Sequence, residues 1–215
     1  MKKIIGLTVG MACLAATLNA QATTSAQLVV RGTITPAACN LSLAGSGIID
    51  YGTIRSGELS RTAFNPREER TTSLVINCGT TPARFGLTFT DLQAGSKVTG
   101  ILGAGFTEAQ NYGLGMVGAR RTGGYSVTLR DLRSSGTTLF PIMRTGFGAW
   151  YNSDGKIAQS PSQYSWRNGV SITPAAISQL TGTLAVKAVI NKAQDLDLSR
   201  DISIDGRATL VLSYI

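Results

Sequence analysis

The chain contains no histidine among its 215 residues and only three cysteines. Without histidine, neither a Ser-His-Asp triad nor a Cys-His pair can form, so the common nucleophilic hydrolases are excluded. Histidine is also a usual ligand of zinc. We therefore expect a protein that acts by binding and is not an enzyme, with no catalytic residue, no metal and no cofactor.

Acidic residues are scarce as well, since 12 Asp and Glu stand against 20 Lys and Arg, for a formal net charge of +8. A glycosidase needs two carboxylates that face each other across a cleft. The acids that are close in sequence fall instead into short runs: Glu68-Glu69, Asp195 with Asp197, and Asp201 with Asp205. A secreted carbohydrate-active enzyme is therefore the weakest of the alternatives.

Long apolar runs are missing except near the N-terminus. Two lysines precede an apolar run from Ile4 to Leu18, which ends in small residues at Ala20 and Ala22. This order is typical of a secretory signal peptide, and the run is shorter than the roughly 20 residues of a membrane span. We expect residues 1–22 to be removed, by cleavage after Ala20 or Ala22. Residues 23–215 then form a single exported domain, in the periplasm or on the cell surface, with no transmembrane segment.

The three cysteines divide according to this processing. Cys13 lies within the expected signal peptide; acylation there, as in a lipoprotein, is an alternative, although Gly10 stands where a bulky aliphatic residue is usual. Cys39 and Cys78 remain as an even pair in an oxidising compartment, which predicts one disulfide between them.

The basic charge points to the class of partner. Loss of the two lysines with the signal peptide lowers the net charge from +8 to +6. An exported protein rarely meets nucleic acid, so we expect none as a partner, whereas a basic surface that faces an anionic glycan or the cell envelope stays open.

Short apolar runs, separated by Gly, Ser and Thr about every ten residues, predict an all-β sandwich. One short helix is expected over Thr173–Leu180, with Pro174 in its first turn. The expected strands are Gln27–Thr35, Ile48–Ile54, Thr72–Cys78, Arg84–Thr90, Gly113–Val117, Tyr125–Arg130, Thr138–Arg144, Gly182–Asn191 and Ile202–Ile215.

The last of these strands is the most informative. Side chains alternate between the two faces of a strand, so the apolar residues at every second position point together toward a core. These residues are Ala208, Leu210, Leu212 and Tyr214. An apolar strand at the end of the chain leaves a hydrogen-bonding edge that another segment must cover. The pattern indicates a binding event.

Four segments together resemble the chaperone–usher fimbrial (pilin-type) subunits, in particular the fimbrial-like exported proteins of unassigned function. Two of them carry the cysteines, one is a short strand between these, and the last has an aromatic residue next to the end of the chain. They are Leu28–Cys39, Asp50–Ile54, Ser73–Cys78 and Gly206–Tyr214.

The resemblance implies an incomplete immunoglobulin-like sandwich with Greek-key connections. A periplasmic chaperone fills its gap first, and the N-terminal extension of a neighbouring subunit does so later in the fibre that an usher assembles. Backbone hydrogen bonds supply affinity in such strand addition, and pockets for alternate side chains supply specificity. By this resemblance Gly206, Ala208, Leu210, Leu212 and Tyr214 would line the groove that the chaperone and the donor strand recognise.

The segment that would donate a strand looks very short. Cleavage leaves only Gln21–Ala26, or Thr23–Ala26, before the strand expected from Gln27. Six residues span roughly 20 Å, and these are small or polar. We therefore expect a subunit that accepts a strand without giving one, in a terminal or accessory position.

Residues 112–167 hold eight aromatic side chains and a surplus of basic ones. Sugars stack on aromatic rings and anions pair with arginine, so this stretch is a candidate glycan or partner surface. Its candidate residues are Arg120, Arg121, Trp150, Tyr151 and Trp166. The alternative is a set of core aromatics with solvated arginines beside them. The alternative function is that of a free-standing periplasmic β-sandwich that binds a ligand or glycan and has no role in a fibre.

Overall fold

The computed structural model describes residues 27–32 and 39–215, which belong to two separate compact units. In the first unit, 27–32 carry no strand, and Leu28, Val29 and Val30 are exposed. The strand expected over Gln27–Thr35 is thus absent from its described part, and its last three residues lie outside the described residues. So does the whole of the expected signal peptide, 1–22.

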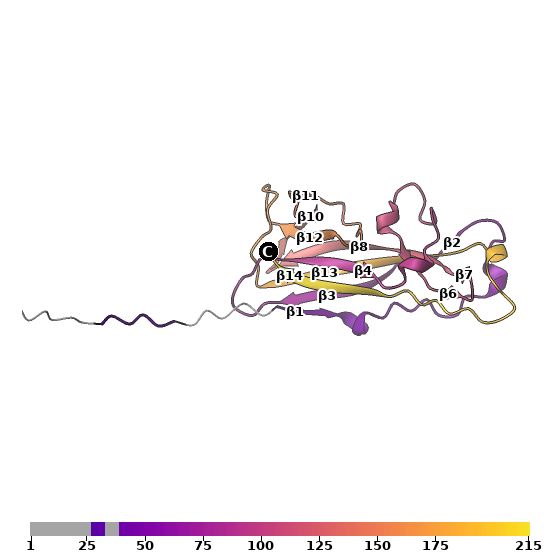
Figure 1. Ribbon diagram of the computed structural model, residues 1–215, viewed down its shortest axis with the longest axis horizontal. Helices are drawn as coiled ribbons and strands as arrows, with labels where there is room; N and C mark the ends of the chain where they lie inside the picture. The colour runs from indigo at the N-terminus through magenta and orange to yellow at the C-terminus, as the bar shows by residue number, and fades with distance from the viewer. Residues whose placement is uncertain (1–26, 33–38) are drawn as a thin grey trace, which may run out of the picture. The chain divides into compact units, whose positions relative to one another are not determined.

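The second unit is all β, and its described residues contain no helix beyond short 3-10 turns (Figure 1). The strands are β1 Asn40–Leu43, β2 Asn65–Pro66, β3 Arg70–Asn77, β4 Phe85–Asp91, β5 Tyr112–Gly113, β6 Met116–Val117, β7 Arg120–Arg121, β8 Gly123–Ser134, β9 Thr137–Thr138, β10 Phe140–Thr145, β11 Tyr151–Asn152, β12 Ser162–Arg167, β13 Gln179–Ile190 and β14 Ala208–Tyr214.

Two antiparallel sheets form the sandwich. The larger has the order β1-β3-β13-β8-β5, with β2 beside β13 and β9 beside β8, and the smaller has the order β11-β10-β12-β4-β14. A separate hairpin joins β6 to β7. Strands far apart in sequence are neighbours in both sheets, as in Greek-key sandwiches. Among the described strands, β1 and β14 are edge strands, each with one neighbour.

The core lies between the two sheets and is rich in aromatic rings. From β4, Phe85, Leu87 and Phe89 are fully buried. The ring of Phe85 meets that of Trp166 edge to face at 4.8 Å, and Phe89 meets Tyr164 at 6.3 Å. Such T-shaped pairs are a preferred geometry for aromatic rings. Leucines, isoleucines and alanines of β3 and β13 close the core from the other sheet.

The predicted disulfide between Cys39 and Cys78 is confirmed. Cys39 precedes β1 and Cys78 follows β3, at the end of the strand pair where Asn40 lies opposite Asn77. The bond therefore ties the start of the edge strand β1 to the end of β3. Cross-linking residues 39 positions apart restricts the unfolded chain, which stabilises the fold by about 4 kcal/mol in the chain-entropy account.

Several expected elements differ from those observed. Ile48–Ile54 forms no strand, because the side chain of Tyr51 makes the contact to β13: its hydroxyl donates to the carbonyl of Val186 and accepts from the amide of Ala188. In addition, Gly52 adopts a positive φ of 64°.

The helix expected over Thr173–Leu180 is absent, because backbone groups of this segment form hydrogen bonds with other segments of the sandwich. The amide of Ala175 donates to Trp166, and Ile177 exchanges two backbone hydrogen bonds with Ala83. β13 then begins at Gln179. The strand expected from Ile202 begins only at Ala208, and Gly113–Val117 divides between β5 and β6.

Buried tyrosines predict a loss of stability at high pH. Burial raises the pKa of Tyr164 to about 12, although the amide of Ala158 donates to its hydroxyl and opposes the shift. Burial also raises the pKa of Tyr112 and of Tyr125. Their folded pKa values lie above the unfolded value of 10.0, so their contribution to stability is full below pH 10 and is lost as the pH rises through the folded values.

We expect the free energy of unfolding to fall as the pH rises from 10.0 toward about 12. Denaturant titrations at a series of pH values measure it, and tyrosinate absorbance reports whether the rings ionise on unfolding. A constant free energy of unfolding across this window would contradict the burial of these rings.

Candidate functional site

The candidate site is a groove along the open side of the sandwich, which we call the edge groove. Its walls are β14 with the preceding residues 204–207 on one side and the segment 43–51 on the other. Its floor contains apolar side chains of both sheets, among them Phe89, Val127 and Leu184. The groove has a volume of about 360 Å³. It therefore lies directly above the buried core, between the two sheet edges.

The inner face of β14 explains why the groove is open. Leu210 lies opposite Phe89 of β4, Leu212 opposite Leu87, and Tyr214 opposite Phe85. The β4 residues are fully buried, whereas Leu210 and Leu212 are only half-buried and 52% of Tyr214 is exposed. The two strands belong to the same sheet, so the difference reflects the lack of any cover over β14 among the described residues.

The backbone of β14 has an unused hydrogen-bonding edge. The carbonyl of Arg207 accepts from Leu92, and the amide of Ile215 donates to Arg84, both on the β4 side. Successive residues of a strand direct their backbone groups to opposite sides. The even-numbered residues therefore direct theirs toward the groove, where no described residue bonds to them.

Gly206 extends this wall beyond the strand. A Cβ atom placed there would lie 2.7 Å from a ring atom of Tyr125, so no larger residue fits without moving that ring. Of the five residues proposed from sequence for strand recognition, Gly206, Ala208 and Leu210 line the edge groove. Leu212 and Tyr214 lie further along the same face of β14 and do not line it.

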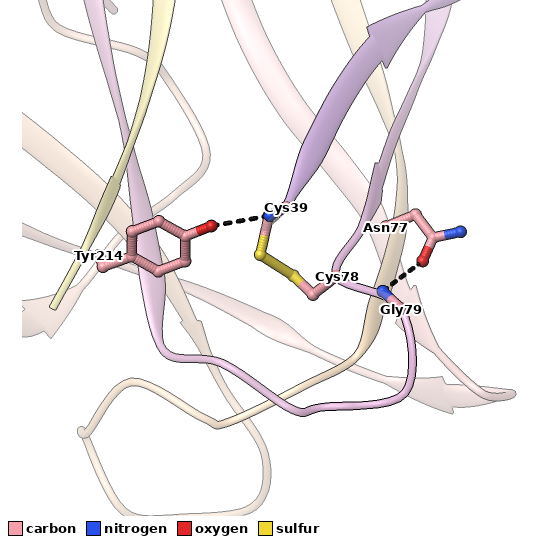
Figure 2. Close-up of a disulfide and its surroundings, with 5 residues drawn as sticks. All are labelled: Cys39, Asn77, Cys78, Gly79 and Tyr214. Carbon is pink, nitrogen blue, oxygen red and sulfur yellow. Dashed lines mark hydrogen bonds between the residues drawn. A yellow bond between two sulfur atoms is a disulfide. The ribbon is translucent and has the colours of Figure 1, made fainter. Parts of the chain in front are cut away.

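The disulfide lies beside the C-terminal end of β14, beyond the residues that line the edge groove. The amide of Cys39 donates to the hydroxyl of Tyr214 at 2.7 Å, as Figure 2 shows. The turn after β3 is held by the amide of Gly79, which donates to the side chain of Asn77. The hydrogen bond between Cys39 and Tyr214 therefore joins the disulfide to the C-terminal end of β14.

At one end the edge groove leads into a second cavity of about 460 Å³. Ile204 lines both spaces, and Ile54, Leu59, Leu196 and Ile202 add apolar surface to the second one. An extended segment in the edge groove would therefore find apolar surface beyond the start of β14.

The aromatic and arginine residues proposed as a glycan or partner surface do not form one site. Trp166 is fully buried against Phe85, so its part in that proposal was wrong. Arg120 and Arg121 are exposed on β7, whereas Trp150 and Tyr151 lie at β11, toward the opposite end of the sandwich (Figure 1). Trp166 resembled a surface residue because sequence alone does not show which face of β12 is inward.

Sequence reasoning missed the opposite wall of the groove. Leu43 and Tyr51 line it, and the fold brings them there through β1 and the hydrogen bonds of Tyr51 to β13. Tyr51 could have indicated a contact to the groove, although the sequence pattern assigned it to a strand.

Within the described ranges, no helix is long and apolar enough to cross a membrane. The same residues contain no cluster of three or more side chains able to hold a metal ion.

Comparison with known proteins gives one match. Residues 28–133 are similar to a family described as a protein of unknown function (DUF1120). The match spans just under half of the chain and includes both cysteines and the wall 43–51, but not β14. No curated protein matches the chain.

The hydrogen bond between Tyr214 and Cys39 gives a direct test of how the C-terminal end of β14 is held. We expect Tyr214→Phe to lower the free energy of unfolding by about 1 kcal/mol, the usual contribution of one hydrogen bond. Tyr151→Phe is the matched control, because the one hydrogen bond of its hydroxyl within the described part of the chain is a long one to Thr145, at 3.4 Å. Denaturant titration measures both, and an equal effect of the two substitutions would contradict the special role of Tyr214.

Proposed function

We propose that this protein is a fimbrial-like structural subunit whose edge groove receives an extended strand from another chain. The observation that carries the proposal is the unbonded edge of β14 beside half-buried inner side chains. A strand laid along β14 would complete its backbone hydrogen bonds and cover Leu210 and Leu212. Strand addition thus supplies both interactions that the sandwich lacks.

The proposal implies partners and a location. A periplasmic pilus chaperone would supply the covering strand first, and a neighbouring fimbrial subunit, positioned by an usher, would replace it. The chain would then be found in the periplasm or in a surface fimbrium. This part depends on removal of the signal peptide predicted at 1–22.

We further propose that the chain carries its own donor segment. The terminal or accessory position suggested from sequence rests on a strand beginning at Gln27, yet 27–32 carry no strand and β1 begins at Asn40. The residues from Thr23 to Cys39 span about 56 Å when extended, whereas the seven residues of β14 span about 23 Å. The segment is thus long enough to cover the edge groove of a neighbour.

The side-chain pattern of that segment fits the groove. Leu28 and Val30 are 90% and 87% exposed. Gly32 and Ile34 continue the same spacing in the sequence. The groove residues on β14 also occupy every second position, so the apolar side chains of a paired segment could point to the same face of the sheet as those of β14. An interior position in a fibre is then as open to this chain as a terminal one.

Mixing two defective chains tests the pairing. Val30→Asp should produce a chain that accepts but does not donate, and Leu210→Asp one that donates but does not accept, because each places a charge in an apolar contact. We expect neither to self-associate, and their mixture to form a one-to-one dimer by size-exclusion chromatography with light scattering. Val211→Asp is the control for Leu210→Asp, since Val211 is its neighbour on the outer face.

Two results would overturn this proposal. A mixture that stays monomeric would show that the segment of one chain does not pair with the groove of another. Equal effects of Leu210→Asp and Val211→Asp would show that the inner face of β14 has no special part in pairing.

Recognition by a chaperone has a separate test. Removal of residues 212–215 should abolish capture by a co-expressed fimbrial chaperone and leave the chain to be degraded, because it shortens β14 and its open backbone edge. Pull-down and periplasmic yield measure this. A truncated chain that remains soluble and abundant would favour a free-standing binding protein instead. So would a wild-type chain that stays monomeric, without any chaperone, at concentrations where the two defective chains pair.

A further inference from the structure

The outer face of the smaller sheet carries arginine and hydroxyl groups but no carboxylate. The strand registers place Arg144 of β10 opposite Gln163 of β12, which lies opposite Thr88 of β4. Side chains that share this face with them are Phe140, Arg167, Thr90, Thr209, Val211 and Ser213, together with Ile142 and Ser165, which are fully buried. Between residues 140 and 167 the one acid is Asp154, and it pairs with Lys156 at 3.0 Å.

Arg144 is held in a fixed orientation on this face. Its guanidinium carbon lies 4.6 Å from the centre of the Trp150 ring, and its Nε donates to Oε1 of Gln163 at 2.7 Å. The amide nitrogen of Gln163 in turn donates to the hydroxyl of Ser213. The stacking and the anchored amide together orient the remaining nitrogens of Arg144.

Arg167 has the same arrangement on the neighbouring strand. Its guanidinium carbon lies 4.8 Å from the centre of the Phe140 ring, and its Nε donates to the side-chain oxygen of Asn152 at 3.1 Å. A further bond joins Nη1 to the carbonyl of Gly169. Two arginines are thus fixed by an aromatic ring and an amide oxygen each.

Neither guanidinium has a carboxylate partner among the described residues, in contrast to Arg130, Arg200 and Arg207. Arg144 keeps both Nη groups, and Arg167 keeps Nη2, without a described hydrogen-bond partner. An oriented guanidinium with free donors and uncompensated charge is suited to bind carboxylate or another oxyanion.

The spacing of the two arginines favours an extended anion. Arg167 lies opposite Phe140 and Arg144 is four residues further along β10, which corresponds to about 14 Å. One small anion cannot reach both, whereas a chain with repeating acidic groups can. Exposed Phe147, in the turn after β10, offers a ring for the apolar side of a sugar.

We propose that the outer face of β10 and β12 binds a linear acidic polysaccharide, with Arg144 and Arg167 as the residues that hold its carboxylates. The rings and hydroxyl groups favour a sugar chain over an acidic peptide. This site lies on the face of the sheet opposite the edge groove, so the proposal does not rest on strand addition.

Binding of polygalacturonate to the full mature chain tests the proposal. We expect Arg144→Gln with Arg167→Gln to weaken binding by more than about tenfold, because two charge-assisted contacts are lost. Arg120→Gln with Arg121→Gln removes the same charge from β7 and should change binding less than about twofold, since remote charges act only through a screened field. Biolayer interferometry at fixed salt measures both pairs, and thermal unfolding confirms that the variants fold.

Polyglutamate and neutral dextran complete the design. We expect wild type to prefer polygalacturonate to polyglutamate and to ignore dextran. Equal losses in the two arginine pairs, no binding of polygalacturonate, or tighter binding of polyglutamate would each overturn the proposal. If the Arg144 and Arg167 variants fail to fold, this wild-type comparison still decides it.

Discussion

The unbonded edge of β14 is the constraint on which the account depends. One side of this strand is bonded to β4, and the other directs backbone groups and half-buried side chains toward the edge groove. A sheet edge of this kind is a template for another strand. In most sandwiches a further strand would cover it; here that cover is proposed to come from a second chain.

The two faces of β14 connect the two proposed sites. Its inner residues, such as Leu210, line the edge groove, while Ser213 on the outer face holds the amide that orients Arg144. Tyr214 links the same strand to Cys39 and hence to the disulfide. A strand that completes the sheet would therefore also restrict the motion of the outer face. The donor strand and the acidic polysaccharide would still bind to different faces of the sheet.

The parts of the fold that could be predicted are those with a strong local pattern. Alternation in Leu184–Ile190 and Leu210–Tyr214 predicted β13 and the inner face of β14, and the even cysteine count predicted the disulfide. Ile48–Ile54 and Thr173–Leu180 failed because tertiary hydrogen bonds from Tyr51 and Ile177 override local preference. The inward direction of Trp166 and the arginine pairs depend on strand register, which a single sequence does not specify.

Amide hydrogen exchange along β14 tests the central claim most directly. In the Val30→Asp chain alone, the amides of Leu210 and Leu212 should exchange fast, and those of Val211 and Ser213, which face β4, should exchange slowly. After the Leu210→Asp chain, which keeps an intact donor segment, is added, both sets should be slow. Slow exchange of both sets in the isolated chain, or fast exchange of Leu210 and Leu212 in the dimer, would contradict the account.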